Sequence, residues 1–252
     1  MAASVVCFFI TAFFECFIKL SFQSFHCNET IFSMVKHDFL VSIRFITKER
    51  PDILKLLLLA ALSRFFVMGI TLVGLPYLVR TILGLNANYY GAAESTLAVA
   101  TILGSIAAGL LTKKLKFGRL SFILASIGIC MIPAGIAFLF STNRIVIYII
   151  NIISFCGMQI AISIFSIFAV SIIQQNIPNY LLGKVMAYTS AITLCVQPVG
   201  QMVYGVLFDE LKETVYFVLI PTGITIFLIG LSAKGFFKDF EQRQLNSLGD
   251  NL

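Results

Sequence analysis

Charged side chains are scarce in this chain of 252 residues, where Asp, Glu, Lys and Arg together make up 12 % of the sequence. A soluble domain carries about 25 %. Apolar residues make up 59 % of the chain, and the mean hydropathy is +0.96. This balance argues against a soluble globular domain and for a protein whose main partner is the lipid bilayer.

Residues of metal, redox and nucleotide chemistry are also few. The chain has two histidines, no H-E-x-x-H motif, no Walker-type glycine loop and no C-x-x-C pair among its six cysteines. These absences speak against a metalloprotease, an ATPase and a structural zinc site. Five of the cysteines lie in apolar segments, where we expect them to act as small packing residues. The sequence therefore predicts a protein that is not an enzyme and needs no metal or other cofactor.

Six long apolar segments fill residues 54 to 233, each flanked by charge and joined by short loops. A bilayer core about 30 Å thick is crossed by about 20 apolar helical residues, and backbone groups inside lipid must satisfy their own hydrogen bonds. Each segment is therefore predicted to be a membrane-spanning helix. The six are Leu54–Val79, Tyr89–Leu111, Leu120–Phe140, Ile145–Ile173, Val185–Phe208 and Val215–Ala233. The short loops make consecutive helices antiparallel neighbours.

A further apolar segment, Ala2–Leu20, precedes these six. A signal peptide begins with positive charge, but no basic residue comes before Lys19, and Glu15 interrupts the apolar run. We interpret residues 1–20 as a lone transmembrane span.

The distribution of Lys and Arg predicts the orientation. Fourteen of the eighteen basic residues fall on one side of the predicted spans and three on the other. Basic loops mark the cytoplasmic side, so we expect a multi-pass cell-membrane protein with its N-terminus outside and its C-terminus in the cytoplasm. The membrane orientation thus explains the net charge of +6, and nucleic acid is not expected as a partner.

Two segments lie outside the spans. In residues 21–53, Val35, Phe39, Ile43 and Ile46 recur at helical spacing, which predicts an amphipathic cytoplasmic linker helix. It would be either solvated or laid along the membrane surface. Residues 234–252 are polar and are predicted to form a partly disordered cytoplasmic tail.

Polar side chains inside the spans are the candidates for function. They are Arg64, Glu94, Asn151, Gln159, Gln197 and Gln201, and they lie in four of the six spans. The spans 120–140 and 215–233 carry no charged or amide side chain in their interiors. This division predicts a central water-accessible cavity lined by four helices, with the other two as outer support.

Each candidate has a structural alternative. Arg64 lies near the predicted midplane, where a charge costs at least ~2.5 kcal/mol, so it contacts either substrate or a structural ion-pair partner. Glu94 is either a proton carrier, since desolvation disfavours a charged carboxylate, or an interfacial side chain. The four amides, Asn151, Gln159, Gln197 and Gln201, either line the cavity or join helices by hydrogen bonds.

Small residues and prolines complete the picture of a packed bundle. Gly104/Ala108 and Ser105/Gly109 have the small-x-x-x-small spacing of close helix packing. Prolines stand inside several of the spans and permit kinks.

The segment 173–187, with sequence IQQNIPNYLLGKVMA, resembles a cytoplasmic loop motif of major facilitator transporters, in the branch of macrolide-efflux and siderophore-export proteins. The following P-V-G-Q at 198–201 and G-V-L-F-D at 205–209 are similar to the ending of the next helix in that family. The segment 45–51 resembles its central linker. By contrast, residues 109–119 match the family's acidic loop motif only loosely, and Lys113 stands near where the acid belongs.

The resemblance implies one half of a twelve-span transporter: a last span of the first half, the linker, and a complete six-helix second half over residues 54–233. It also implies proton-driven efflux of small, largely apolar compounds, and a partner that is either a missing N-terminal half or a second copy. Within the loop motif, Pro178, Gly183 and Lys184 would form a structural turn with a cytoplasmic anchor. Two other functions stay open, namely a non-transporting remnant that regulates another membrane protein, and a subunit of a permease.

Overall fold

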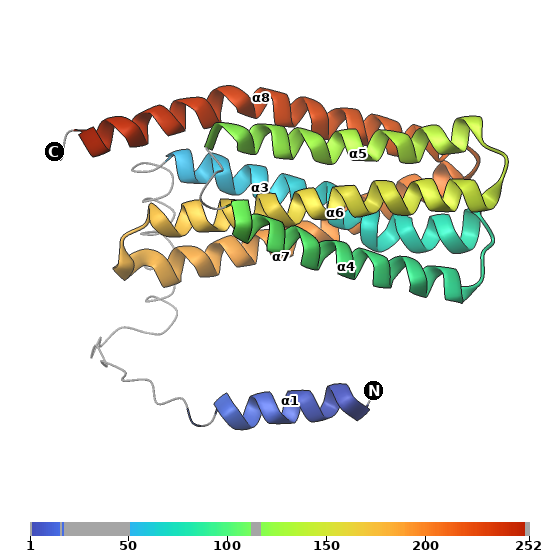
Figure 1. The fold of residues 1–252 in the computed structure, drawn as a ribbon, viewed down its shortest axis with the longest axis horizontal. Helices are drawn as coiled ribbons and strands as arrows, with labels where there is room; N and C mark the ends of the chain where they lie inside the picture. The colour runs from blue at the N-terminus through green and yellow to red at the C-terminus, as the bar shows by residue number, and fades with distance from the viewer. Residues whose placement is uncertain (1, 16, 18–50, 112–116, 250–252) are drawn as a thin grey trace. The chain divides into compact units, whose positions relative to one another are not determined.

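The computed structural model describes residues 2–15, 17, 51–111 and 117–249, and these residues are mostly helical, with short connections and no β-strand. The chain divides into two units, Met1–Leu40 and Val41–Leu252. In the described part of the first unit, α1 (Ala2–Glu15) is an apolar helix of fourteen residues. The second unit is a bundle of long helices (Figure 1).

Six helices of the described residues are long and apolar enough to cross a membrane. They begin with α3 (Pro51–Gly69), which two π-helical segments, η2 (Ile70–Gly74) and η3 (Tyr77–Ile82), continue. The others are α4 (Ala87–Leu111), α5 (Leu120–Phe140), α6 (Arg144–Gln175), α7 (Asn179–Glu210) and α8 (Tyr216–Gly249). Short 3₁₀ turns, η4 (Phe117–Arg119) and η5 (Lys212–Thr214), precede α5 and α8. The predicted all-α membrane bundle is confirmed.

Several helix ends differ from the prediction because polar residues continue a helix beyond its apolar run. The predicted loop 174–184 shrinks to residues 176–178, since α6 runs to Gln175 and α7 begins at Asn179. The predicted partly disordered tail is wrong for most of its length, because α8 continues to Gly249. Phe237 and Phe240 are buried there, and the Lys55 ammonium lies 5.7 Å from the centre of the Phe236 ring.

The remaining early segments lie mostly outside the described residues. The described helix α1 covers residues 2–15 of the lone span predicted over 1–20. Of the predicted linker 21–53, only residues 51–53 are described, and they form the first turn of α3. Pro51 is the first residue of that helix, a position where its missing N–H leaves no intrahelical bond unmade.

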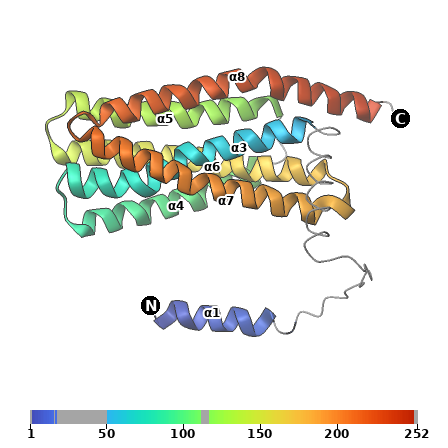
Figure 2. The same ribbon diagram turned by 180° about the vertical axis from the view of Figure 1, so that it is seen from behind.

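Within the bundle the helices lie at successive levels, as Figures 1 and 2 show. The apolar helices α5 and α8 pack together along one side, α3 and α6 lie in the middle, and α4 and α7 lie on the opposite side. Helix α4 packs mainly on α6, and α7 packs mainly on α3. Only 22 % of the apolar 18-residue stretch of α4 and 17 % of that of α7 are buried inside the bundle, against 39–44 % in the other four helices. The open side of the bundle is therefore the side of α4 and α7.

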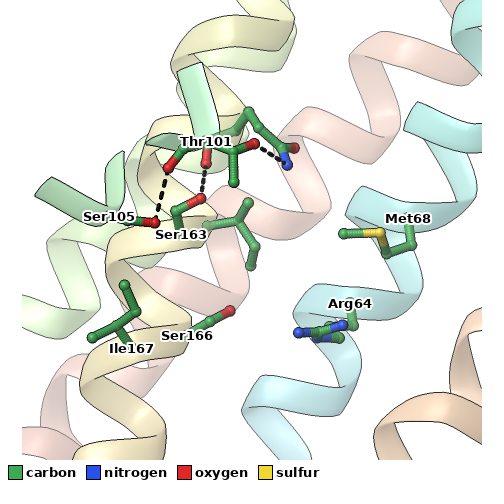
Figure 3. A pocket seen from close by; sticks show the side chains of 9 residues that line it. Arg64, Met68, Thr101, Ser105, Ser163, Ser166 and Ile167 are labelled. Carbon is green, nitrogen blue, oxygen red and sulfur yellow. Dashed lines mark hydrogen bonds between the residues drawn. The ribbon is translucent and has the colours of Figure 1, made fainter. Parts of the chain in front are cut away.

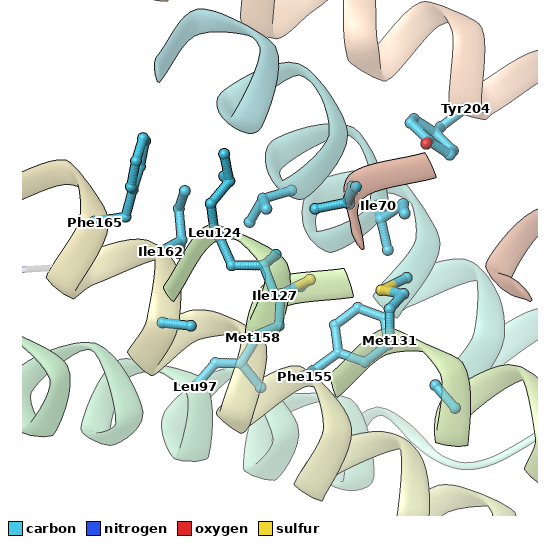
Figure 4. Close-up of a cluster of buried hydrophobic side chains, with 14 of the residues drawn as sticks. Ile70, Leu97, Leu124, Ile127, Met131, Phe155, Met158, Ile162, Phe165 and Tyr204 are labelled. Carbon is cyan, nitrogen blue, oxygen red and sulfur yellow. The ribbon is translucent and has the colours of Figure 1, made fainter. Parts of the chain in front are cut away.

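The core lies between the middle pair and its neighbours (Figure 4). Phe155, Met158 and Phe165 of α6 are fully buried, together with Ile127 and Met131 of α5. A fully buried apolar side chain of this size makes dozens of close contacts. This core fixes α6 as the central helix and so fixes the face that α6 turns toward α3 and α4.

A close approach between α4 and α6 depends on Gly104. A Cβ atom at this position would lie 2.9 Å from the Ile160 carbonyl oxygen and 2.9 Å from Ser163 Cβ. Ala108, one turn later, is completely buried, whereas Gly109 has no atom within 4 Å of its would-be Cβ. The packing prediction is thus confirmed for Gly104/Ala108, and Ser105/Gly109 lies on a different face.

Candidate functional site

A cavity of about 190 Å³ opens between α3, α4 and α6 in the membrane-spanning part of the bundle. Its lining comprises one cationic side chain, one amide, four hydroxyls and three apolar side chains (Figure 3). They are Arg64 and Met68 of α3, Thr101 and Ser105 of α4, and Gln159, Ile162, Ser163, Ser166 and Ile167 of α6. Six of these nine residues have polar side chains, so hydrogen-bonding groups gather here between helices that are otherwise apolar.

Helical spacing explains why these residues meet. Residues three, four and seven apart share a helix face, as Arg64/Met68 do on α3 and Thr101/Ser105 do on α4. The site is also deep in the membrane span. Arg64 is about 20 Å along the helix axis from Pro51, and Thr101 is about 21 Å from Ala87, at 1.5 Å per residue.

One hydrogen-bond chain crosses the cavity wall from α6 to α4. Gln159 Nε2 donates to Thr101 Oγ1 at 3.0 Å, and Thr101 Oγ1 donates to the Leu97 carbonyl oxygen at 3.0 Å. Because the threonine proton is committed to Leu97, Thr101 must accept from Gln159, which fixes the amide with its nitrogen toward Thr101. The amide oxygen, Gln159 Oε1, is then buried with no hydrogen-bond partner among the described residues.

The serine hydroxyls of the lining differ in whether their protons already make a hydrogen bond. Ser105 donates to the Thr101 carbonyl oxygen at 2.9 Å, and Ser163 donates to the Gln159 carbonyl oxygen at 2.8 Å. Ser166 makes no hydrogen bond within the described part of the chain. In Figure 3 its hydroxyl extends toward the side of the cavity where Arg64 lies.

Arg64 has neither a hydrogen bond nor an ion pair among the residues that the structure describes. Its side chain is half-buried and lines the cavity. A charge at this depth of a bilayer costs at least ~2.5 kcal/mol unless water or a counter-charge meets it. The sequence alternative of a structural ion pair therefore finds no partner in the described part of the bundle.

Of the other predicted residues, Glu94 lies two turns before Thr101 on α4 and outside this cavity. Its carboxylate is half-buried and accepts a hydrogen bond from the Tyr90 hydroxyl at 3.0 Å. A ligand in the cavity would not touch Glu94, so any role in proton coupling would act from a separate position on the same helix.

The remaining amides do not join the cavity lining. Asn151 is buried in α6, where its Nδ2 donates to the Ile147 carbonyl oxygen at 2.9 Å. Its Oδ1 has no partner among the described residues. Gln197 and Gln201 are half-buried on α7. The predicted four-helix lining thus becomes a three-helix lining, because α7 contributes no residue to it.

The loop-motif residues take positions at the start of α7. Pro178 directly precedes the helix. Gly183 and Lys184, predicted to form a turn and an anchor, lie exposed inside α7. The prediction of a turn at Gly183 is wrong, because helix continues through it, and no atom lies within 4 Å of its would-be Cβ.

Sequence reasoning identified Arg64 and Gln159 but missed the hydroxyl residues around them. Thr101, Ser163 and Ser166 carry no charge or amide, and hydroxyl residues are common in membrane helices. The available signal was spacing, since Gln159, Ser163 and Ser166 repeat at intervals of four and three on one face of α6.

Comparison of the chain with protein-family models, with curated proteins and with solved structures found no match. The site itself therefore carries the functional argument.

Proposed function

We propose that this chain is one six-helix half of a secondary active transporter of the major facilitator type, which exports small, largely apolar compounds in exchange for protons. The observation that carries the proposal is the cavity around Arg64, which polar side chains of three apolar membrane helices line. Ionisable residues within membrane spans typically face a pathway or a water-filled cavity. A membrane anchor or a structural protein has no use for such a lining.

The half-transporter part of the proposal rests on the open side of the bundle. Helices α4 and α7 are the least covered of the six, and the cavity is lined on that side by α4. In alternating access, substrate binds between two helical units that rock against each other. A second six-helix unit facing this side, whether another chain or a second copy, would complete the path.

An efflux assay in cells tests the proposal. Where the chain pairs with a second six-helix unit, its expression should lower the accumulation of small fluorescent organic compounds, and a protonophore should abolish the effect. Arg64→Gln should slow export by about tenfold or more, since hydrogen bonds to a charged group contribute about 1.5–3 kcal/mol.

Arg80→Gln is the matched control, because Arg80 lies exposed near the end of the same span, away from the cavity lining. Unchanged accumulation in cells where the chain is present at normal levels in a particle with a second six-helix unit would contradict transport. It would favour the alternative of a regulatory or permease subunit.

A further inference from the structure

The cavity around Arg64 separates hydrogen-bond donors from acceptors, and this separation carries information about the ligand. Among the described residues, the Arg64 guanidinium and the Ser166 hydroxyl are the lining donors that have no partner. Thr101, Ser105 and Ser163 have donated their protons to backbone carbonyls of their own helices. In Figure 3 these three hydroxyls gather together, apart from Arg64.

From this arrangement we propose that the cavity binds a small amphiphilic monocarboxylate that also carries a hydroxyl group. The proposal rests on the transport function above, and it narrows the substrates of that site from largely apolar compounds to amphiphilic ones that carry one carboxylate. The carboxylate would accept from Arg64 and Ser166. The ligand's hydroxyl would donate to the lone pairs of Ser105 and Ser163.

Charge balance favours one negative charge on the ligand. Among the described residues, Arg64 is the one charged side chain of the lining. It neutralises a monoanion, whereas a phosphate monoester brings close to two negative charges at neutral pH. A second charge without a partner in this low-dielectric setting is strongly unfavourable. A lipid headgroup is an unsuitable source of the anion, because Arg64 lies about 20 Å along α3 from its first residue.

The apolar part of the ligand would contact the rest of the lining. Met68, Ile162 and Ile167 supply the apolar side chains of the cavity. The volume of about 190 Å³ is below the 300–1,000 Å³ of sites for drug-sized molecules. A single ring or a short alkyl group matches this space.

A binding measurement tests the ligand class without requiring transport. The chain contains no tryptophan, so Ile167→Trp places a single fluorescent reporter at an exposed position of the lining. Mandelate, which combines a carboxylate, a hydroxyl and one ring, is titrated into this variant in phosphatidylcholine nanodiscs. Calorimetry on the unmodified chain repeats the titration, in case the tryptophan alters the site.

Mandelate should bind saturably. Mandelamide, which has the same shape but no charge, should bind about tenfold to a hundredfold more weakly, and phenylacetate, which lacks the hydroxyl, about two- to tenfold more weakly. Phenyl phosphate should also bind more weakly than mandelate. In the protein, Arg64→Gln should match the loss seen with mandelamide, and Ser166→Ala should weaken binding about two- to tenfold. Arg80→Gln and Ser126→Ala are the controls, since Ser126 lies on α5 and bonds to the Ile123 carbonyl oxygen.

The proposal is overturned if mandelate fails to bind the unmodified chain, if mandelamide binds equally well, or if Arg64→Gln leaves binding unchanged. Absence of binding, combined with a change in particle mass in Arg64→Gln, would assign Arg64 to an ion pair with another chain. Export in cells without mandelate binding overturns the ligand class alone, whereas mandelate binding without export contradicts transport and leaves the site standing.

Discussion

Replacing Gly104 by alanine tests the packing that forms one wall of the cavity. The new Cβ would lie 2.9 Å from the Ile160 carbonyl oxygen and from Ser163 Cβ, closer than real Cβ contacts. Backbone and Cβ atoms cannot rotate aside, so α4 must move away from α6. Overpacking of this kind costs typically 1–3 kcal/mol. The matched control is Gly109→Ala, on the same helix, where nothing lies within 4 Å.

Comparing the two variants removes the effect of helix propensity. Glycine-to-alanine changes favour a helix by about 0.5–1 kcal/mol at either position, so the difference between the variants isolates the steric term. We expect Gly104→Ala to be less stable than Gly109→Ala by about 1–3 kcal/mol. Unfolding of both in mixed detergent micelles, followed by circular dichroism, measures this difference. Equal stability would refute the close α4–α6 contact.

Two further predictions concern orientation and proton coupling. Thr142 and Asn179 are exposed near opposite ends of α6. In a variant whose six native cysteines are replaced, a cysteine at Thr142 should react with an impermeant reagent from outside, and one at Asn179 should react from the cytoplasm. Labelling of both from one side would refute the predicted topology. Glu94→Gln should reduce the dependence of export on the proton gradient. The control is Asp209→Asn, which removes the ion-pair partner of Lys212 at 2.9 Å and should leave that dependence unchanged. Unchanged proton coupling in Glu94→Gln would give Glu94 a packing role.

The spans could be predicted because lipid imposes one simple rule on sequence. A run of about 20 apolar residues must form a helix, and the segment Leu120–Phe140 was predicted with the bounds that α5 has. Helix ends outside the apolar runs escape this rule. Polar residues such as Gln174 and Lys184 are as compatible with helix as with loop, so the connection before α7 was predicted too long.

The candidate site was only partly readable from sequence. Arg64 and Gln159 stand out because charge and amides are rare in these spans, and both line the cavity. Asn151 has the same chemistry but points into packed α6 surroundings, where it is 3 % exposed. Which face of α6 a residue occupies depends on the rotation of α6 about its axis relative to α3 and α4. A helix that is apolar on all sides has no polar face in its sequence from which this rotation could be predicted.

The half-transporter account is tested most directly by measuring particle mass and transport on the same purified preparation. The chain is purified in mild detergent, its mass is determined by light scattering, and proton-driven export is measured after reconstitution into liposomes. We predict that a monomer is inactive and that export requires a particle containing a second six-helix unit, since substrate must pass between two units. A stable monomer of this chain that exports substrate by itself would contradict the account.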